Sequence, residues 1–220
     1  MEHRDSRDPP VPLAAPVSAP APAGLMAAYD DGVRAVLRIA AEFTPATWEL
    51  STTCPEWRAC DLAAHLRCVA EDYHEYLDDA PESRLSKLMA AGAPAPSIAR
   101  KLARQNAAEL AVLPEAPPGQ HIAAFARSAV SYASRVAPLL ALPHHSYRGR
   151  VITVAGMAGL AGVEWHLHAW DLASALGAGY EPARAESVRD AWLAGVAQVP
   201  LLADDDPWLA VLRSSGRLAG

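Results

Sequence analysis

The sequence predicts an all-α protein, and three observations support this fold class. Hydrophobic residues make up 51% of the 220 residues, and alanine dominates them, whereas Phe occurs 2 times and Tyr 6 times. Apolar residues recur at helical spacing in several long segments, and no segment alternates apolar and polar residues as a half-buried strand does. Four long helices joined by loops favour an antiparallel four-helix bundle, with shorter helices packed on its outside.

The individual helices are predicted from apolar stripes and from the breaks between them. Thr53 and Glu56 have the spacing of a capping box at the start of the second helix. Pro143 ends the fourth helix, and Gly177 follows the longest helix as a stop signal. We expect helices over residues 25–43, 54–77, 98–110, 121–142, 151–176, 183–197 and 207–214.

The chain divides into a short tail and one domain. Residues 1–23 are rich in Pro and Ala, and Pro at this density blocks both helix and sheet, so we expect a disordered tail. This segment lacks the basic start and the apolar stretch of a signal peptide. Residues 24–220 are expected to form the helical bundle domain with a short C-terminal helical extension.

Charge and cysteine content exclude several classes of partner. The net charge is −6 and no basic run occurs, so nucleic acid is not expected as a partner. The longest uncharged apolar stretch, residues 151–163, is too short to span a membrane. The 3 cysteines are odd in number and lie in one short segment, which indicates a reducing compartment and hence a cytoplasmic protein. A monomer and a homodimer both remain open.

Two predicted helices carry acidic and imidazole side chains along one face. On the longest helix, Glu164, His168 and Asp171 follow the spacing i, i+4, i+7, whereas His166 is turned about 200° from Glu164 and faces elsewhere. On the second helix the same kind of stripe is formed by Asp61, His65, Cys68 and Asp72. If both stripes point into the bundle, they meet.

A divalent metal ion would remove the cost of burying such groups unpaired. His65, Glu164 and His168 supply two imidazoles and one carboxylate, a ligand set that suits a catalytic zinc ion with one open position. Asp61 and Asp171, each about one turn from a histidine, could accept the second ring N–H of the ligands. The alternative is that each histidine is an ordinary surface or core residue.

Two further features of these helices allow more than one interpretation. Cys68 is either a fourth ligand or, more simply, a small buried hydrophobic residue. Gly156, Gly159 and Gly162 recur every three residues in the longest helix. They do not form a phosphate loop, which would follow a strand. They indicate either close contact between helices or room for a ligand.

Two segments resemble the signatures of a known family. The segment "TTCPEWRACDLAAHL" (residues 52–66) resembles the first signature of the DinB-like, mycothiol-dependent maleylpyruvate isomerases of actinobacteria. The segment "EWHLHAWDLASALG" (residues 164–177) is similar to their second signature. The order of the two is that of the family, and the resemblance covers roughly residues 25–180.

The resemblance implies a DinB-like four-helix bundle and a site. By the matching motif positions, His65, Glu164 and His168 would hold Zn²⁺ or another divalent metal ion. Relatives use the low-molecular-weight thiol mycothiol as a cosubstrate. Some isomerise maleylpyruvate, and others resemble thiol S-transferases of antibiotic assembly. The isomerases continue into a separate C-terminal domain, whereas only about 40 residues follow Tyr180 here, which makes maleylpyruvate a less expected substrate.

These observations lead to one main hypothesis and two alternatives. In the main hypothesis a metal-bound thiolate attacks an electrophilic small molecule, and the reaction is thiol S-transfer or exchange. The first alternative is a cis–trans isomerase of the maleylpyruvate type, and the second is a non-catalytic binding module stabilised by a metal ion. Arg150 and Tyr147 precede the longest helix and are weak candidates for binding a substrate carboxylate and for donating a proton.

Overall fold

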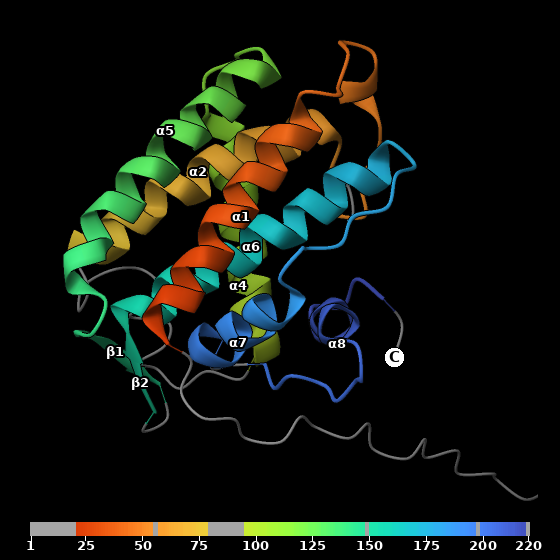
Figure 1. Ribbon diagram of the computed structural model, residues 1–220. Helices are drawn as coiled ribbons and strands as arrows, with labels where there is room; N and C mark the ends of the chain where they lie inside the picture. The colour runs from red at the N-terminus through yellow and green to blue at the C-terminus, as the bar shows by residue number, and fades with distance from the viewer. Residues whose placement is uncertain (1–20, 55–56, 79–94, 148–149, 197–198, 219–220) are drawn as a thin grey trace, which may run out of the picture.

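The computed structural model is mostly helical, and Figure 1 shows long helices packed side by side with a small hairpin at one end. It describes residues 21–54, 57–78, 95–147, 150–196 and 199–218. The bundle is formed by α1 (Pro22–Ala40), α2 (Ala59–Asp78), α5 (Pro118–Val136) and α6 (Val154–Ala175). Helix α1 packs along α6, and α2 packs along α5. The predicted all-α bundle is confirmed.

Three further helices pack around this bundle. Helix α4 (Ala95–Val112) lies against α2 on the outside and is longer than expected, while α7 (Ala185–Gly195) packs on α6. Helix α8 (Pro207–Ser214) has the predicted bounds, because the Asp206 side chain caps the backbone N–H groups of Trp208 and Leu209. Short 3₁₀ turns occupy Thr47–Glu49 and Ala137–Leu139. These elements confirm the expected short C-terminal helices.

The expectation that the chain contains no strand is wrong. Strands β1 (Pro143–Tyr147) and β2 (Arg150–Thr153) pair antiparallel between α5 and α6. The β-branched run Val151, Ile152 and Thr153 favours an extended backbone. Helix α6 therefore begins at Val154, where the Thr153 hydroxyl accepts a hydrogen bond from the Gly156 backbone N–H at 3.1 Å.

The start of α2 also differs from the prediction. The helix begins at Ala59, and its first turn is capped by Asp61, whose carboxylate accepts the backbone N–H of Arg58 at 2.9 Å. Thr53 is therefore not the N-cap, and Glu56 lies outside the described residues. Of the predicted tail, residues 1–20 also lie outside the described residues, and α1 begins at Pro22.

Helix α6 passes through the centre of the core. Trp165 is fully buried and its ring lies edge-on to those of Tyr29, Tyr73 and Phe125, which come from α1, α2 and α5. Such aromatic contacts from three helices fix the rotation of α6 about its own axis. This packing therefore also orients the face of α6 that carries Glu164, His168 and Asp171.

Glycines bring α6 into close contact with two neighbouring helices. A Cβ atom at Gly162 would lie 2.9 Å from the Cα of Tyr29 on α1. A Cβ atom at Gly195 of α7 would lie 2.3 Å from the carbonyl oxygen of Gly156. Gly159 faces Ala191 of α7 in the same way. The glycine spacing therefore reflects close helix contact, and these three α6 positions leave no room for a ligand.

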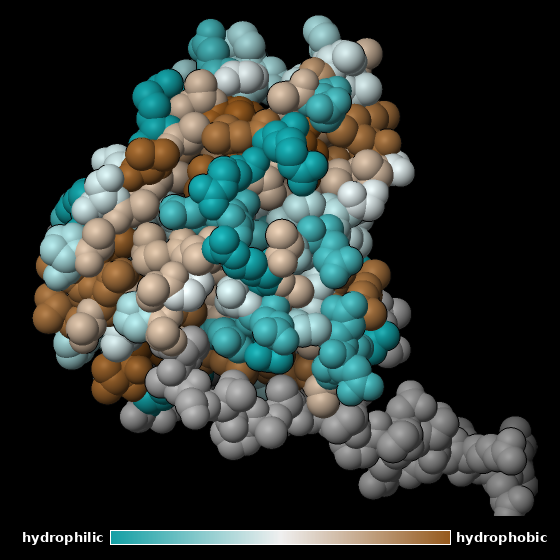
Figure 2. Space-filling model, viewed as in Figure 1, coloured by the Kyte–Doolittle hydropathy of each residue, from teal (hydrophilic) through white to brown (hydrophobic). Residues whose placement is uncertain are grey.

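A band of polar side chains lies on the side that α1 presents. Figure 2 shows these hydrophilic side chains running down the middle of the face, with apolar patches on either side of them and towards both ends of the bundle. Exposed apolar side chains include Val130 on α5 and Leu142 and Val151 at the hairpin. Within the described residues, no helix combines the length and the apolar character that crossing a membrane requires.

Candidate metal centre

His65 and His168 lie together between α2 and α6. Their ring centroids are 5.1 Å apart and the ring planes are nearly perpendicular. Both residues are buried. Burial, and then the neighbouring His168, holds the pKa of His65 well below its usual value. Burial also lowers the pKa of His168, against the opposing effect of Asp171. Two neutral imidazoles, each with a free lone pair, therefore meet at this point.

The two ring nitrogens of His168 have different environments. Its Nδ1 lies 2.9 Å from Oδ2 of Asp171, and since a carboxylate only accepts, Nδ1 carries the proton. The Nε2 atom then carries the lone pair. The buried Nδ1 of His65 has no hydrogen-bond partner among the described residues, so no hydrogen bond fixes the protonated nitrogen of this ring. The ring itself packs against Trp57, with the centroids 4.7 Å apart.

Asp171 is fully buried and accepts hydrogen bonds from four other residues. Arg217 donates through Nε and Nη2 at 2.9 and 2.7 Å, and His168 donates through Nδ1. The Thr53 hydroxyl and the Cys54 thiol complete the set. Burial alone would raise the pKa of Asp171, but the hydrogen bonds from His168 and Arg217 outweigh it and hold this pKa far below its usual value.

Glu164 lies one helical turn before His168 on the same face of α6. Burial raises the pKa of Glu164 to about 7, while the nearby Arg217 lowers it and Asp72 raises it further. Its carboxylate is half-buried and has no hydrogen bond or ion pair with the described residues. A carboxyl group in this position is available to an exogenous ligand.

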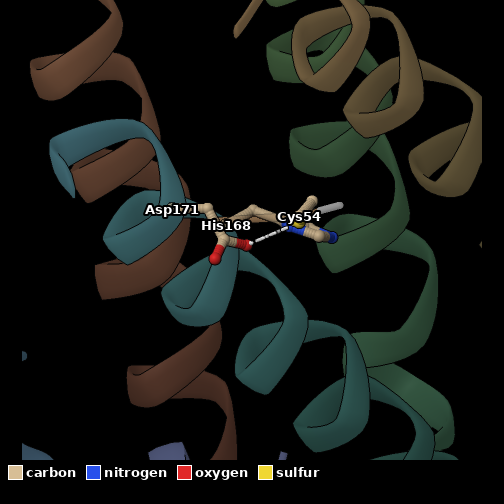
Figure 3. Close-up of side chains that lie close together, drawn as sticks. All are labelled: Cys54, His168 and Asp171. Atoms are coloured by element: carbon tan, nitrogen blue, oxygen red, sulfur yellow. Dashed lines mark hydrogen bonds and ion pairs between the residues drawn. The ribbon is translucent and has the colours of Figure 1, made fainter. Parts of the chain in front are cut away.

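The predicted ligands do not all converge in this structure. Cys54, His168 and Asp171 each offer one possible ligand atom, and these three atoms lie within 4.8 Å of one another. No other such group of three occurs in the described part of the chain. Figure 3 shows Cys54 beside these two side chains of α6. The Asp171 oxygens are already occupied by Arg217, and burial raises the pKa of the Cys54 thiol to about 12. These three residues therefore form a poor set of metal ligands. Their hydrogen bonds instead hold His168 in place.

Comparison with known families gives one match. The family model of the mycothiol maleylpyruvate isomerase N-terminal domain matches residues 29–173, more than half of the chain. The chain belongs to this family. No curated protein and no solved structure matches it significantly. The matched region contains His65, Glu164 and His168.

The structure places other predicted site residues away from this centre. Asp61 bonds to Arg58 and not to His65, so the expected support of that histidine is absent in this structure. Arg150 donates to the carbonyl groups of Leu193 and Ala194 at the end of α7, and is thus engaged in capping that helix.

Three further residues considered in the sequence, His166, Cys68 and Tyr147, are also not placed at this centre. Nε2 of His166 donates to the Ala28 carbonyl at 2.9 Å and its Nδ1 accepts from Tyr180, so this ring points away from His168, as expected. Cys68 does not join the metal-binding group, and burial raises its pKa to about 11. The side chain of Tyr147 lies outside the described residues.

Three residues of the site were not found by sequence reasoning. The sequence predicts Thr53 and Cys54 at the start of a helix, and it assigns no role to Arg217. The pairing of Asp171 with His168, in contrast, is indicated by their i, i+3 spacing, and the structure contains it. No local pattern indicates Arg217, because its partner is 46 residues away in the chain.

In this family member, the donor groups fit a divalent metal ion. The buried Nδ1 of His65 has no partner, Nε2 of His168 carries a free lone pair, and Glu164 has no ion pair among the described residues. Imidazole and carboxylate donors suit zinc and related cations. His65, Glu164 and His168 are therefore retained as the candidate ligands.

Proposed function

We propose that this protein is a metal-dependent enzyme that uses mycothiol to transfer or exchange a thiol on an electrophilic small molecule. One observation carries the proposal. The imidazoles of His65 and His168 lie together between α2 and α6, and Glu164 lies one helical turn before His168 without an ion pair among the described residues, in a chain of a mycothiol-related family. A purely structural core would gain nothing from burying the Nδ1 atom of His65, which has no hydrogen-bond partner among the described residues.

His65, Glu164 and His168 would hold the metal ion, which we propose to be zinc. When bound, zinc supplies a positive charge that favours thiolate over thiol at neutral pH. Asp171 keeps the proton of His168 on Nδ1 and so leaves Nε2 free for binding. Trp57 packs on the ring of His65 and limits the access of water to that side.

The proposed reaction is a nucleophilic substitution. A bond forms between the thiolate sulfur and an electrophilic carbon, and the bond from that carbon to the leaving group breaks with its electron pair. The proton of the thiol passes to solvent. The buried setting of His65 and His168 favours such chemistry because it weakens competition by water.

Isomerisation is the second candidate, and the family description favours it. In that reaction the thiolate adds to a conjugated double bond, the resulting single bond rotates, and elimination restores both the double bond and the thiol. The two reactions share their first bond-forming step. They differ in whether the thiol is consumed.

The experiment follows the thiol and the metal together. Purified protein is incubated with mycothiol and either maleylpyruvate or a set of alkylating electrophiles, and the free thiol and the substrate are quantified. Stoichiometric loss of mycothiol, with release of the leaving group, supports transfer or exchange, and substrate conversion at constant mycothiol supports isomerisation. His65→Ala should abolish either activity, while His121→Ala, which changes a buried histidine of α5, should retain it. Metal-loaded protein that does neither would be a binding module and would refute the enzyme proposal.

We also propose a cytoplasmic location. A cosubstrate thiol requires a reducing compartment, and Cys54, Cys60 and Cys68 are all free thiols.

A further inference from the structure

The end of the chain turns back onto the bundle after α8. Gly216 has a φ of +77°, in the left-handed region that glycine adopts readily. Its N–H bonds to the carbonyl of Arg213 at 3.0 Å, and the N–H of Arg217 bonds to the carbonyl of Leu212 at 2.9 Å. These two bonds form a Schellman motif that fixes the backbone of Arg217 relative to α8.

The side chain of Arg217 reaches from this turn to the middle of α6. Its guanidinium group makes a two-point contact with Asp171, from Nε to Oδ1 and from Nη2 to Oδ2. The side chain of Arg217 is 16% exposed and that of Asp171 is 0% exposed. A buried, bidentate arginine–carboxylate pair fixes the plane of the carboxylate as well as its position.

The orientation of this carboxylate determines where it meets His168. Nε and Nη2 of Arg217 bind Oδ1 and Oδ2 of Asp171, and in this orientation Oδ2 also faces Nδ1 of His168. The Thr53 hydroxyl, from the loop that precedes α2, donates to Oδ1 of Asp171. Without the guanidinium fork, only the single-point donors Thr53, Cys54 and His168 itself would orient the carboxylate.

We infer that Arg217 is a positioning residue of the metal centre, acting through Asp171 on His168. The inference rests on the proposed function, because it assumes that His168 is a metal ligand. Arg217 lies beyond residues 29–173, the region that the family model matches. A residue of the C-terminal segment thus completes a site whose ligands lie within the family domain.

The test measures zinc affinity at one fixed pH by competition with a chromophoric chelator. Arg217→Ala should bind zinc about 10- to 100-fold more weakly than wild type, which is the usual effect of removing a partner that orients a ligand. Arg217→Lys keeps the charge but loses the fork, so its affinity should fall by about threefold or more. Arg213→Ala is the matched control, because Arg213 belongs to α8 and pairs with Asp204 instead.

Guanidinium rescue separates positioning from general stability. Millimolar guanidinium ion should restore zinc binding to Arg217→Ala by filling the space of the lost group. It should not restore binding to His168→Ala. Circular dichroism of each metal-free variant reports whether it is folded, and if Arg217→Ala does not fold, Arg217→Lys carries the test alone.

The outcomes distinguish this inference from the proposed function. Wild-type protein that binds no divalent metal ion overturns both. Wild-type protein that binds zinc while Arg217→Ala and Arg217→Lys bind it equally well overturns the role of Arg217 alone. Equal losses in Arg213→Ala and Arg217→Ala would show a general effect of the C-terminal segment and would also overturn it.

Discussion

The rings of His65 and His168 lie 5.1 Å apart and at 89° to each other, although one residue belongs to α2 and the other to α6. Two buried, neutral imidazoles at this separation can each present a nitrogen to a common ion. Each helix brings its histidine to this point through the same bundle packing that buries Trp165.

Metal content is the first prediction. Protein that has never met a chelator should contain about one divalent ion per chain, preferentially zinc, because two imidazoles and a carboxylate form a catalytic ligand set. Glu164→Ala should lose most of it. His121→Ala is the control, and elemental analysis of both variants is the measurement. Full occupancy in Glu164→Ala would show that this carboxylate is not a ligand.

The cysteines should be dispensable for metal binding. Cys54 donates its thiol hydrogen to Asp171 at 3.3 Å and does not need to be deprotonated for that role. A triple Cys→Ser variant should therefore retain its metal within about a factor of three, since the serine hydroxyl at position 54 can replace the donor. If the triple variant is metal-free while Glu164→Ala is not, the ligands are Cys54, His168 and Asp171 instead.

Thiol binding should depend on the metal ion. Isothermal titration of mycothiol should show binding to zinc-loaded protein and at least about tenfold weaker binding to the metal-free form, with release of a proton in the first case. Repeating the titration in buffers of different ionisation enthalpy gives the number of protons that are released on binding. Equal affinity in the two forms would mean that the thiol site is elsewhere.

Arg150 should matter for stability and not for the substrate. Its guanidinium group donates to the carbonyl groups of Leu193 and Ala194 at the end of α7. Because Arg150 is partly exposed, Arg150→Gln should cost about 1 kcal/mol, which corresponds to roughly 2–4 °C in Tm for a chain of this size. Calorimetry and KM are the measurements. A raised KM at unchanged Tm would return Arg150 to the substrate site.

The stability of the metal-free protein should fall in mild acid, partly through His145. Nε2 of His144 donates to the Tyr76 carbonyl, so Nδ1 of His144 accepts from Nδ1 of His145. The buried Nε2 of His145 then has no hydrogen-bond partner among the described residues. Burial, and then His144, lowers the pKa of His145 to about 4 from an ordinary 6.5. The unfolded chain therefore binds the extra proton first as the pH falls.

This contribution is complete above pH 6.5 and is lost as the pH falls towards about 4. The slope of the unfolding free energy against pH reports the number of protons taken up on unfolding. His145→Gln should lower this number by up to about one in that pH window. Urea unfolding over a pH series measures the slope. A variant with the wild-type slope would show that His145 is not buried as a neutral ring.

The sequence allowed the histidine-bearing faces to be predicted, because helical periodicity is a local property. It placed His168 and Asp171 on one face of α6, and the structure pairs them. The sequence does not predict the hairpin, although Val151, Ile152 and Thr153 form a β-branched run, because this run continues into the apolar residues of α6 and the whole stretch has the composition of one helix.

Other contacts could not be predicted from local patterns. Thr53 fits a capping box in sequence, yet its hydroxyl binds Asp171, 118 residues away. Arg217 has no pattern that distinguishes it from a solvated arginine, and its role depends on the turn at Gly216. Both contacts require the whole bundle to be assembled first.

The close approach of Gly195 to Gly156, and of Gly162 to Tyr29, has a consequence for what determines the position of α6. A slide of α6 by one residue is about 1.5 Å, and any larger side chain at these crossings would meet backbone atoms. The helix that carries Glu164 and His168 is therefore locked in register from two sides. The loops at the ends of the bundle are not part of these crossings. The spacing of Glu164 and His168 relative to α1 and α7 is therefore set by helix packing and not by the loops.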